Sequence, residues 1–252
     1  MTLGETHGRP AANQPECCEG GGLSAACRVC TVRPRAVCAT LDDGELARLD
    51  AIAARVTAAS GTDIFREGEP AGALYNLTAG TVKLYKLLPD GRRQVTGFLF
   101  PGDFLGLAMN DAYAHTAEAM GDAALCRFPR GRFEGLLERI PRLEHRLLAM
   151  ASNELAQAQD QMLLLGRKTA TEKIASFLLL LSRRQAARGE AASPVHLPMG
   201  RTDIADYLGL TTETVSRTLT SLKTGGPIRL LPGNAVELRD RAALEALAEG
   251  GS

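Results

Sequence analysis

The sequence has no tryptophan, only 4% aromatic residues and a formal net charge of zero. Zero net charge excludes a chain-wide electrostatic attraction to nucleic acid or to an acidic surface. The longest apolar run, around residues 177–181, is far shorter than the roughly 20 residues that cross a bilayer. The first residues are polar and lack the apolar core of a signal peptide. We therefore expect a cytoplasmic protein with no membrane partner.

Motifs of the common enzyme classes are also missing from the sequence. We find no phosphate-binding P-loop, nucleophile elbow, dinucleotide fingerprint or metal-binding HExxH helix. The chain is therefore predicted not to be an enzyme. Its 45% hydrophobic and 23% charged residues are ordinary for a globular protein, and 252 residues allow one large or two small domains.

The charge is unevenly distributed along the chain. Residues 167–230 contain ten lysines and arginines but only five aspartates and glutamates. A local positive excess suits a surface that meets phosphates, although a solvated basic face has the same composition.

The pattern of apolar residues changes along the chain and predicts an α+β protein. Residues 57–128 contain short apolar or alternating stretches separated by glycines, which is typical of an antiparallel β-roll or barrel. A long helix follows Pro141. We divide the chain into a disordered lead-in with a cysteine-rich segment (1–40), a β-roll domain (41–138), a long helix (139–166) and a C-terminal domain (167–252).

The long helix carries an apolar stripe in alternating steps of three and four residues, the spacing of a coiled-coil seam. The stripe consists of Leu148, Ala151, Leu155, Ala158, Met162 and Leu165. Such a stripe can pack on its own domain instead. Because the neighbouring short strands offer little helical partner surface, we favour a homodimer.

The C-terminal part has the pattern of a helix-turn-helix between Arg201 and Leu222. Gly209 falls where the backbone must turn sharply, and Thr211 is a suitable N-cap for the second helix. The second helix would bury one face and turn polar side chains outward, where they suit base edges and phosphates of double-stranded DNA. The candidate DNA-binding residues are Arg201, Thr212, Glu213, Ser216, Arg217 and Thr220. Residues 228–231 and 235–238 are predicted to form a β-hairpin wing.

The six cysteines do not indicate a disulfide framework in a cytosolic protein, because thiols stay reduced there. Cys27, Cys30 and Cys38 have the spacing C-x2-C-x7-C, and Cys126 adds a distant fourth thiol. Four thiolates suit either a zinc ion or a [4Fe–4S] cluster, and spacing alone does not separate them. Cys17 and Cys18 lie outside this spacing and have no assigned role.

Together these residues resemble the FNR branch of the CRP/FNR superfamily of bacterial transcription regulators. The resemblance runs from about residue 27 to 238. It is carried by the cysteine set, by Gly102-Asp-Phe-Leu-Gly and above all by Tyr207-Leu-Gly-Leu-Thr-x-Glu-Thr-Val-Ser-Arg. It implies a cyclic-nucleotide-binding-domain-like β-roll, a long dimerisation helix and a C-terminal winged helix-turn-helix.

The function that the resemblance implies is oxygen-responsive control of transcription. FNR-like proteins hold a [4Fe–4S] cluster on cysteines that match Cys27, Cys30, Cys38 and Cys126. Oxygen degrades that cluster, the dimer weakens and binding to palindromic TTGAT-type sites is lost. The x7 spacing is similar to that of alphaproteobacterial relatives. A zinc-stabilised regulator of the same fold, with another input, is the alternative.

Three further expectations follow from the resemblance. Cyclic AMP binding is disfavoured, because His115 replaces the arginine of the family's phosphate-binding segment and its glutamate is missing. The hairpin at residues 87–94 is similar to the family's contact with RNA polymerase, although a plain solvated turn has the same sequence. Ala158 stands where enteric members carry an aspartate in the dimer seam, so we expect a dimer that depends less steeply on the cluster.

Overall fold

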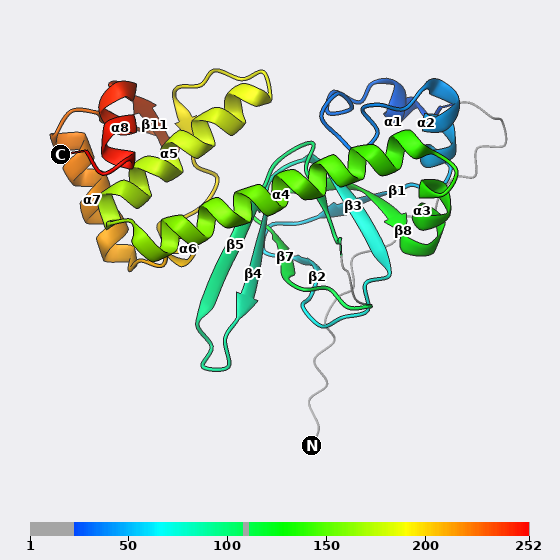
Figure 1. Cartoon of the computed structure of the whole chain (residues 1–252), viewed down its shortest axis with the longest axis horizontal. Helices are drawn as coiled ribbons and strands as arrows, with labels where there is room; N and C mark the ends of the chain where they lie inside the picture. Colours follow the sequence, from blue (N-terminus) through cyan, green and yellow to red (C-terminus); the bar gives the residue numbers. More distant parts are fainter. Residues whose placement is uncertain (1–22, 108–110, 252) are drawn as a thin grey trace. The chain divides into compact units, whose positions relative to one another are not determined.

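The computed structural model describes residues 23–107 and 111–251 (Figure 1). Cys17, Cys18 and the rest of the predicted lead-in lie outside the described residues. The chain divides into two compact units, one formed by residues up to 84 with 98–148, the other by 85–97 with 149 onward. The segment 85–97 therefore groups with the C-terminal residues, which the sequence-based domain division does not anticipate.

Strands β1 to β8 form an antiparallel β-roll of two four-stranded sheets, with orders β1-β8-β3-β6 and β2-β7-β4-β5; most of this roll belongs to the first unit, and residues 85–97 of β4 and β5 belong to the second. The strands are β1 Ala54–Ala58, β2 Asp63–Phe65, β3 Ala73–Ala79, β4 Val82–Leu87, β5 Arg93–Leu99, β6 Phe104–Leu105, β7 Thr116–Ala119 and β8 Ala123–Pro129. Between β4 and β5 the predicted hairpin closes with Gly91 at φ 84°. The β-roll prediction is confirmed.

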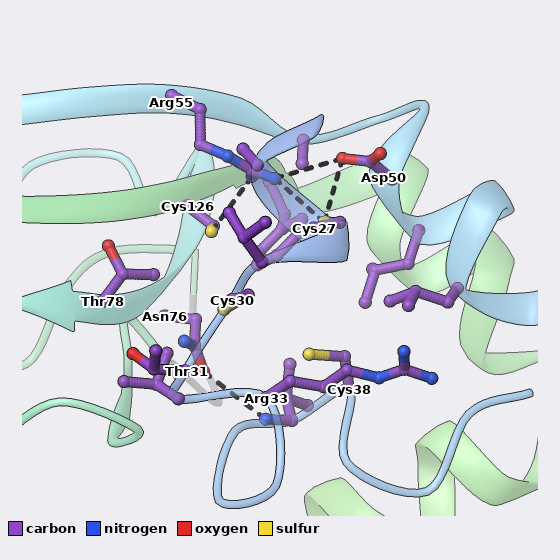
Figure 2. A pocket seen from close by; sticks show the side chains of 18 residues that line it. Cys27, Cys30, Thr31, Arg33, Cys38, Asp50, Arg55, Asn76, Thr78 and Cys126 are labelled. Atoms are coloured by element: carbon purple, nitrogen blue, oxygen red, sulfur yellow. Dashed lines mark hydrogen bonds and ion pairs between the residues drawn. The ribbon is translucent and has the colours of Figure 1, made fainter. Parts of the chain in front are cut away.

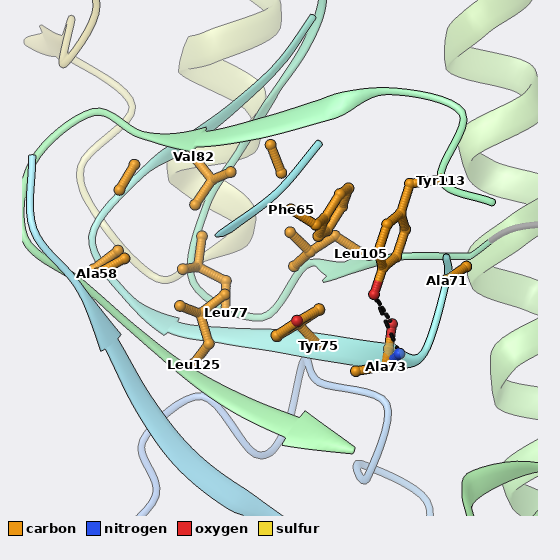
Figure 3. Close-up of a cluster of buried hydrophobic side chains, with 13 residues drawn as sticks. Ala58, Phe65, Ala71, Ala73, Tyr75, Leu77, Val82, Leu105, Tyr113 and Leu125 are labelled. Atoms are coloured by element: carbon orange, nitrogen blue, oxygen red, sulfur yellow. Dashed lines mark hydrogen bonds between the residues drawn. The ribbon is translucent and has the colours of Figure 1, made fainter. Parts of the chain in front are cut away.

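Buried side chains from both sheets fill the interior of the roll (Figure 3). Phe65 and Tyr113 stack with ring centroids 3.9 Å apart, and Tyr75 stacks against Phe65 at 5.7 Å. The Tyr113 hydroxyl donates to the Ala73 carbonyl oxygen at 2.8 Å. These contacts form the hydrophobic core that fixes the sheets around it.

Three short helices complete the first unit: α1 Ala25–Arg28, α2 Asp43–Asp50 and α3 Arg130–Leu137. They lie together beside strands β1 and β8 (Figure 1). Helix α2 begins with a capping box, in which Asp42 accepts from the Glu45 amide and Glu45 accepts from the Asp42 amide. Helix α2 ends at Asp50.

Helix α4 runs from Pro141 to Arg167 and passes from the first unit to the second after Leu148. It matches the long helix expected after Pro141. Within the described residues, no helix is both long enough and apolar enough to cross a membrane.

The second unit contains the predicted winged helix-turn-helix. Its elements are α5 Ala170–Ala187, β9 Val195–His196, α6 Arg201–Leu208, α7 Thr212–Thr224, β10 Ile228–Leu231, β11 Ala235–Leu238 and α8 Arg241–Ala248. The strands form one small sheet in the order β10-β11-β9. Buried apolar residues such as Phe177, Ile204 and Leu208 form its core, and the Phe177 and Tyr207 rings lie 5.5 Å apart.

Candidate cofactor pocket and nucleic-acid interface

The four predicted ligands line one cavity of about 240 Å³ in the first unit (Figure 2). Cys27 lies in helix α1, Cys30 and Cys38 lie in the turns between α1 and α2, and Cys126 lies in strand β8. Residues almost one hundred positions apart in the sequence therefore meet at one site. The other polar residues of the lining include Asp50, Arg55, Asn76 and Thr78.

Local hydrogen bonds explain the positions of the cysteine-bearing turns. Ser24 caps α1 by accepting from the Cys27 amide, and its own amide donates to Asp50 Oδ2 at 2.6 Å. Farther along, Val37 is buried, and its amide donates to Asn76 Oδ1 at 3.4 Å. The Cys27 end of the segment is thus anchored to α2 and the Cys38 end to strand β3.

Strand register places Cys126 between two polar residues. In the sheet, Cys126 pairs with Arg55 of β1 on one side and with Asn76 of β3 on the other. Because side chains alternate along a strand, all three lie on one face, opposite to the buried Leu125 and Leu77. The cavity is therefore on the outer face of this sheet, away from the core of the roll.

An arginine connects two of the thiols with a carboxylate. Arg55 Nη1 donates to Cys126 Sγ at 3.0 Å, and Nη2 donates to Cys27 Sγ at 3.0 Å and to Asp50 Oδ1 at 3.1 Å. The Cys27 thiol also donates to Asp50 Oδ1 at 3.2 Å. Although burial favours its protonated form, hydrogen bonds from Ser24 and Cys27 and the charge of Arg55 hold the pKa of Asp50 below its usual value.

Burial governs the acidity of the thiols. It raises the pKa of Cys126 to about 12 and that of Cys38 to about 11, and it raises the pKa of Cys27 as well. These three thiols are therefore protonated at neutral pH, and a metal must displace their protons when it binds.

The spacing of the ligands bears on the kind of metal site. Across residues 23–107 and 111–251, no three His, Cys, Asp or Glu side chains are gathered closely enough to hold a single metal ion. A zinc site needs all its sulfur ligands about 2.3 Å from one point. In a cubane cluster each thiolate binds a different iron, so the sulfurs surround a larger volume. The four thiols on the wall of one cavity provide the donor set that either group requires.

The second unit presents the predicted DNA-reading helix. Gly209 has φ 61°, the left-handed conformation needed between α6 and α7, and Thr211 caps α7 by accepting from the Thr214 amide. Val215, Leu219 and Leu222 are buried and make up the inner face that the sequence predicts for this helix. The outward set is exposed throughout: Thr212, Glu213, Ser216, Arg217 and Thr220.

Two details define how these side chains are presented. Arg217 Nη1 lies 3.8 Å from Glu213 Oε1. About three quarters of each side chain is exposed, so both are available to DNA. The Ser216 hydroxyl donates to the Thr212 carbonyl oxygen, which orients its lone pairs outward. Arg201, at the start of α6, is half-buried, and burial lowers the pKa of its guanidinium.

Comparison with known proteins adds independent evidence. Residues 55–140 match the cyclic nucleotide-binding domain and residues 172–247 the Crp-like helix-turn-helix domain. The nitrogen fixation regulation protein FixK of Bradyrhizobium diazoefficiens is 46% identical over 222 residues, which cover 88% of this chain and 93% of that protein. The transcriptional activator protein FnrL of Cereibacter sphaeroides is 41% identical over 222 residues, covering 86% and 90%. The chain belongs to the CRP/FNR family of transcription regulators.

Solved structures agree with this assignment. FixK2 from Bradyrhizobium japonicum superimposes on the CRP/FNR regulator described here with a TM-score of 0.73 at 41% identity, covering 78% of this chain and 97% of that one. The protein is thus a DNA-binding transcription regulator with a β-rich N-terminal domain, a long helix and a C-terminal helix-turn-helix. Its similarity is to regulators, which confirms that it is not an enzyme.

The predicted seam of this CRP/FNR regulator lies on one face of α4. Leu148, Leu155 and Met162 are spaced by seven residues and are 64%, 59% and 65% exposed, respectively. Ala158 is exposed as well, whereas Ala151 and Leu165 are half-buried.

Sequence analysis missed several polar residues that position the site. Arg55, Asp50 and Asn76 surround the thiols, although none of them has a motif of its own. In the second unit, Arg93 donates to Asp203 at 3.0 Å and to Asp206 at 2.9 Å, which ties the hairpin 85–97 to helix α6. The sequence signals no pairing between side chains more than one hundred residues apart.

Proposed function

We propose that this CRP/FNR regulator responds to oxygen or redox state through a [4Fe–4S] cluster held by Cys27, Cys30, Cys38 and Cys126, which controls dimerisation and binding to palindromic TTGAT-type DNA sites. The observation that carries the proposal is the meeting of these four thiols around one cavity. Its relatives include a nitrogen fixation regulation protein of Bradyrhizobium diazoefficiens and an anaerobic regulatory protein of Pasteurella multocida, which agrees with this proposal.

The donor set and its surroundings fit such a cluster. Thiolates are the usual ligands of iron–sulfur clusters, and the cavity is lined by apolar residues as well as by the four cysteines. Four thiols around one cavity match the four-cysteine ligand set of such a cluster. When bound, the cluster would supply the sensitivity to oxygen.

The chain also offers a route from the cavity to the predicted dimer interface. In the first unit, Arg146 of α4 donates to the carbonyl oxygens of Arg35 and Ala36, shortly before Cys38. A change in the cysteine-bearing turns therefore acts directly on the start of the helix that carries the seam. Two paired copies would place two reading helices about one turn of DNA apart.

The exposed tip of the hairpin at residues 87–94 is assigned to contact with RNA polymerase. Leu87 and Leu88 are 60% and 43% exposed, and two neighbouring apolar side chains on the surface suit a protein contact. Arg93 and Gln94, by contrast, are engaged with α6, so only the tip is available.

Anaerobic purification followed by absorption spectroscopy and iron and sulfide analysis tests the proposal. We expect about four irons and four sulfides per chain, a broad visible absorbance that bleaches in air, and a parallel loss of binding to a TTGAT palindrome. The Cys126→Ser variant should remain pale. A colourless wild-type protein with one equivalent of zinc would refute the cluster and support the zinc-stabilised alternative.

A further inference from the structure

Arg55 occupies an unusual position among the residues around the thiols. One guanidinium group donates to two of the four predicted ligands, through Nη1 to Cys126 and through Nη2 to Cys27, each at 3.0 Å. A guanidinium is a rigid, planar fork, so it can address two sulfur atoms at once, which a lysine ammonium does less well. Figure 2 shows it reaching across the top of the cavity toward both sulfurs.

The fold holds this guanidinium in place from two directions. Arg55 is in register with Cys126 on the neighbouring strand, so the backbone sets the distance between them. Asp50, only 9% exposed at its side chain, accepts from Arg55 Nη2 at 3.1 Å and fixes the direction of the fork. Asp50 also accepts from the Ser24 amide, which ties the Cys27 helix to the same carboxylate.

The charge of Arg55 matters for any cluster on these ligands. Four thiolates give an assembled [4Fe–4S] cluster a net negative charge, which partial burial would otherwise leave poorly compensated. Hydrogen bonds to the sulfurs and nearby positive charge stabilise the more reduced state of such a cluster and so raise its reduction potential. A cluster with a higher potential is harder to oxidise.

We infer that Arg55, oriented by Asp50, is a positioning residue for the cluster, which hydrogen-bonds to the Cys27 and Cys126 thiolates and slows the oxidative loss of the cluster. The inference rests on the proposed function, because it assumes that a cluster binds. It goes beyond that function in assigning the sensitivity of the sensor to a residue that is not a ligand. Arg55 would set how much oxygen is needed for a response, while the cysteines set only whether a cluster is held.

The test compares Arg55→Gln and Arg55→Lys with the wild-type full-length chain after anaerobic reconstitution with iron and sulfide. We expect Arg55→Gln to lower the reduction potential of the cluster and to speed both its bleaching in air and its anaerobic loss to an iron chelator by about 10- to 100-fold. Arg55→Lys, which keeps the charge but not the fork, should lie between Arg55→Gln and the wild type. Asp50→Asn should shift the potential in the same direction as Arg55→Gln.

Arg66→Gln is the matched control, because Arg66 pairs with Asp63 in the same unit and does not line the cavity. If Arg55→Gln retains its cluster and its potential as well as Arg66→Gln does, the inference is wrong although the proposed function stands. If the wild type takes up no cluster, both fail. Should Arg55→Gln not fold, as judged by its thermal transition, Arg55→Lys decides: a potential and bleaching rate equal to the wild type would overturn the inference, and a shift in both would support it.

Discussion

Arg146 donates a hydrogen bond from Nη2 to the carbonyl oxygen of Arg35 at 2.6 Å, so the first turns of helix α4 are bonded directly to the cysteine-bearing segment. A second bond runs from Arg146 Nε to the carbonyl oxygen of Ala36 at 3.3 Å. Cys38 follows two residues later, and Leu148 of the seam lies two residues after Arg146. The cavity and the seam are therefore connected through one side chain.

Replacing Arg146 should uncouple the cysteine-lined cavity from the seam on α4. We expect Arg146→Ala to reduce the difference in dimer affinity between cluster-loaded and cluster-free protein, by at most the roughly 1.5–3 kcal/mol that a hydrogen bond from a charged group contributes. Sedimentation equilibrium of both forms measures this difference. Arg142→Ala is the control, since its ion pairs to Asp42 and Glu45 are long, at 3.8 and 3.9 Å, and the Arg142 side chain is 63% exposed. An unchanged difference in Arg146→Ala would show that the coupling runs elsewhere.

The apolar stripe on α4 is expected to hold two copies of the chain together. Leu155→Glu should shift the chain to monomers, because each buried leucine contributes about 1.5–3 kcal/mol and a symmetric seam loses two of them. Leu163→Glu is the matched control, because Leu163 is 65% exposed on the same helix but lies off the stripe. Light scattering or sedimentation distinguishes them. Equal dissociation by both variants would mean that the predicted seam is not the interface.

The cluster-free chain gives a second test of the seam. Ala158 leaves the stripe without a like-charge pair, so we expect part of the cluster-free protein to stay dimeric at micromolar concentration. Ala158→Asp should make it monomeric. A wild-type chain that is entirely monomeric without its cluster would contradict this expectation.

The regular elements and the reading helix could be predicted from sequence because their signals are local. Period-two and period-3.6 patterns mark the strands and helices, and Gly209 and Thr211 mark the turn. Strand β6, with two residues, and helix α1, with four, are too short for any periodicity to show. Strand β6 is held by its pairing with β3, and α1 is held by its Ser24 cap together with the bond from the Ser24 amide to Asp50.

The candidate site also combines features that the local sequence indicates with features that depend on distant contacts. The ligand set could be proposed from cysteine spacing, but the roles of Arg55 and Asn76 depend on which residues face Cys126 across the sheet. Strand register depends on how strands far apart in the sequence pair across the roll, and no local pattern in the sequence indicates it. The neighbours that tune a site are therefore harder to predict than its ligands.

The contact between the hairpin at residues 85–97 and helix α6 is expected to stabilise α6. Arg93 donates to Asp203 and Asp206, and all three side chains are at most one quarter exposed. We expect Arg93→Ala to lower protection of the α6 amides in hydrogen exchange, with a cost of about 1.5–3 kcal/mol for losing charged hydrogen bonds. Arg92→Ala, which breaks only an exposed pair with Asp90, should leave α6 unchanged. Similar protection in both variants would show that the contact does not stabilise α6.

DNA recognition gives the last prediction. Arg217 is exposed at the N-terminal half of α7, where a base contact is expected, whereas Lys223 is exposed in its last turn, where a phosphate contact is expected. Arg217→Ala should therefore cost about 1–3 kcal/mol on a TTGAT palindrome and relax the preference at one base pair of each half-site. Lys223→Ala should weaken binding to all sequences alike and reduce the salt dependence. Binding to matched and randomised duplexes over a salt series separates the two effects. A uniform loss for Arg217→Ala would place its guanidinium on a phosphate, and base readout would then fall to Glu213 and Ser216.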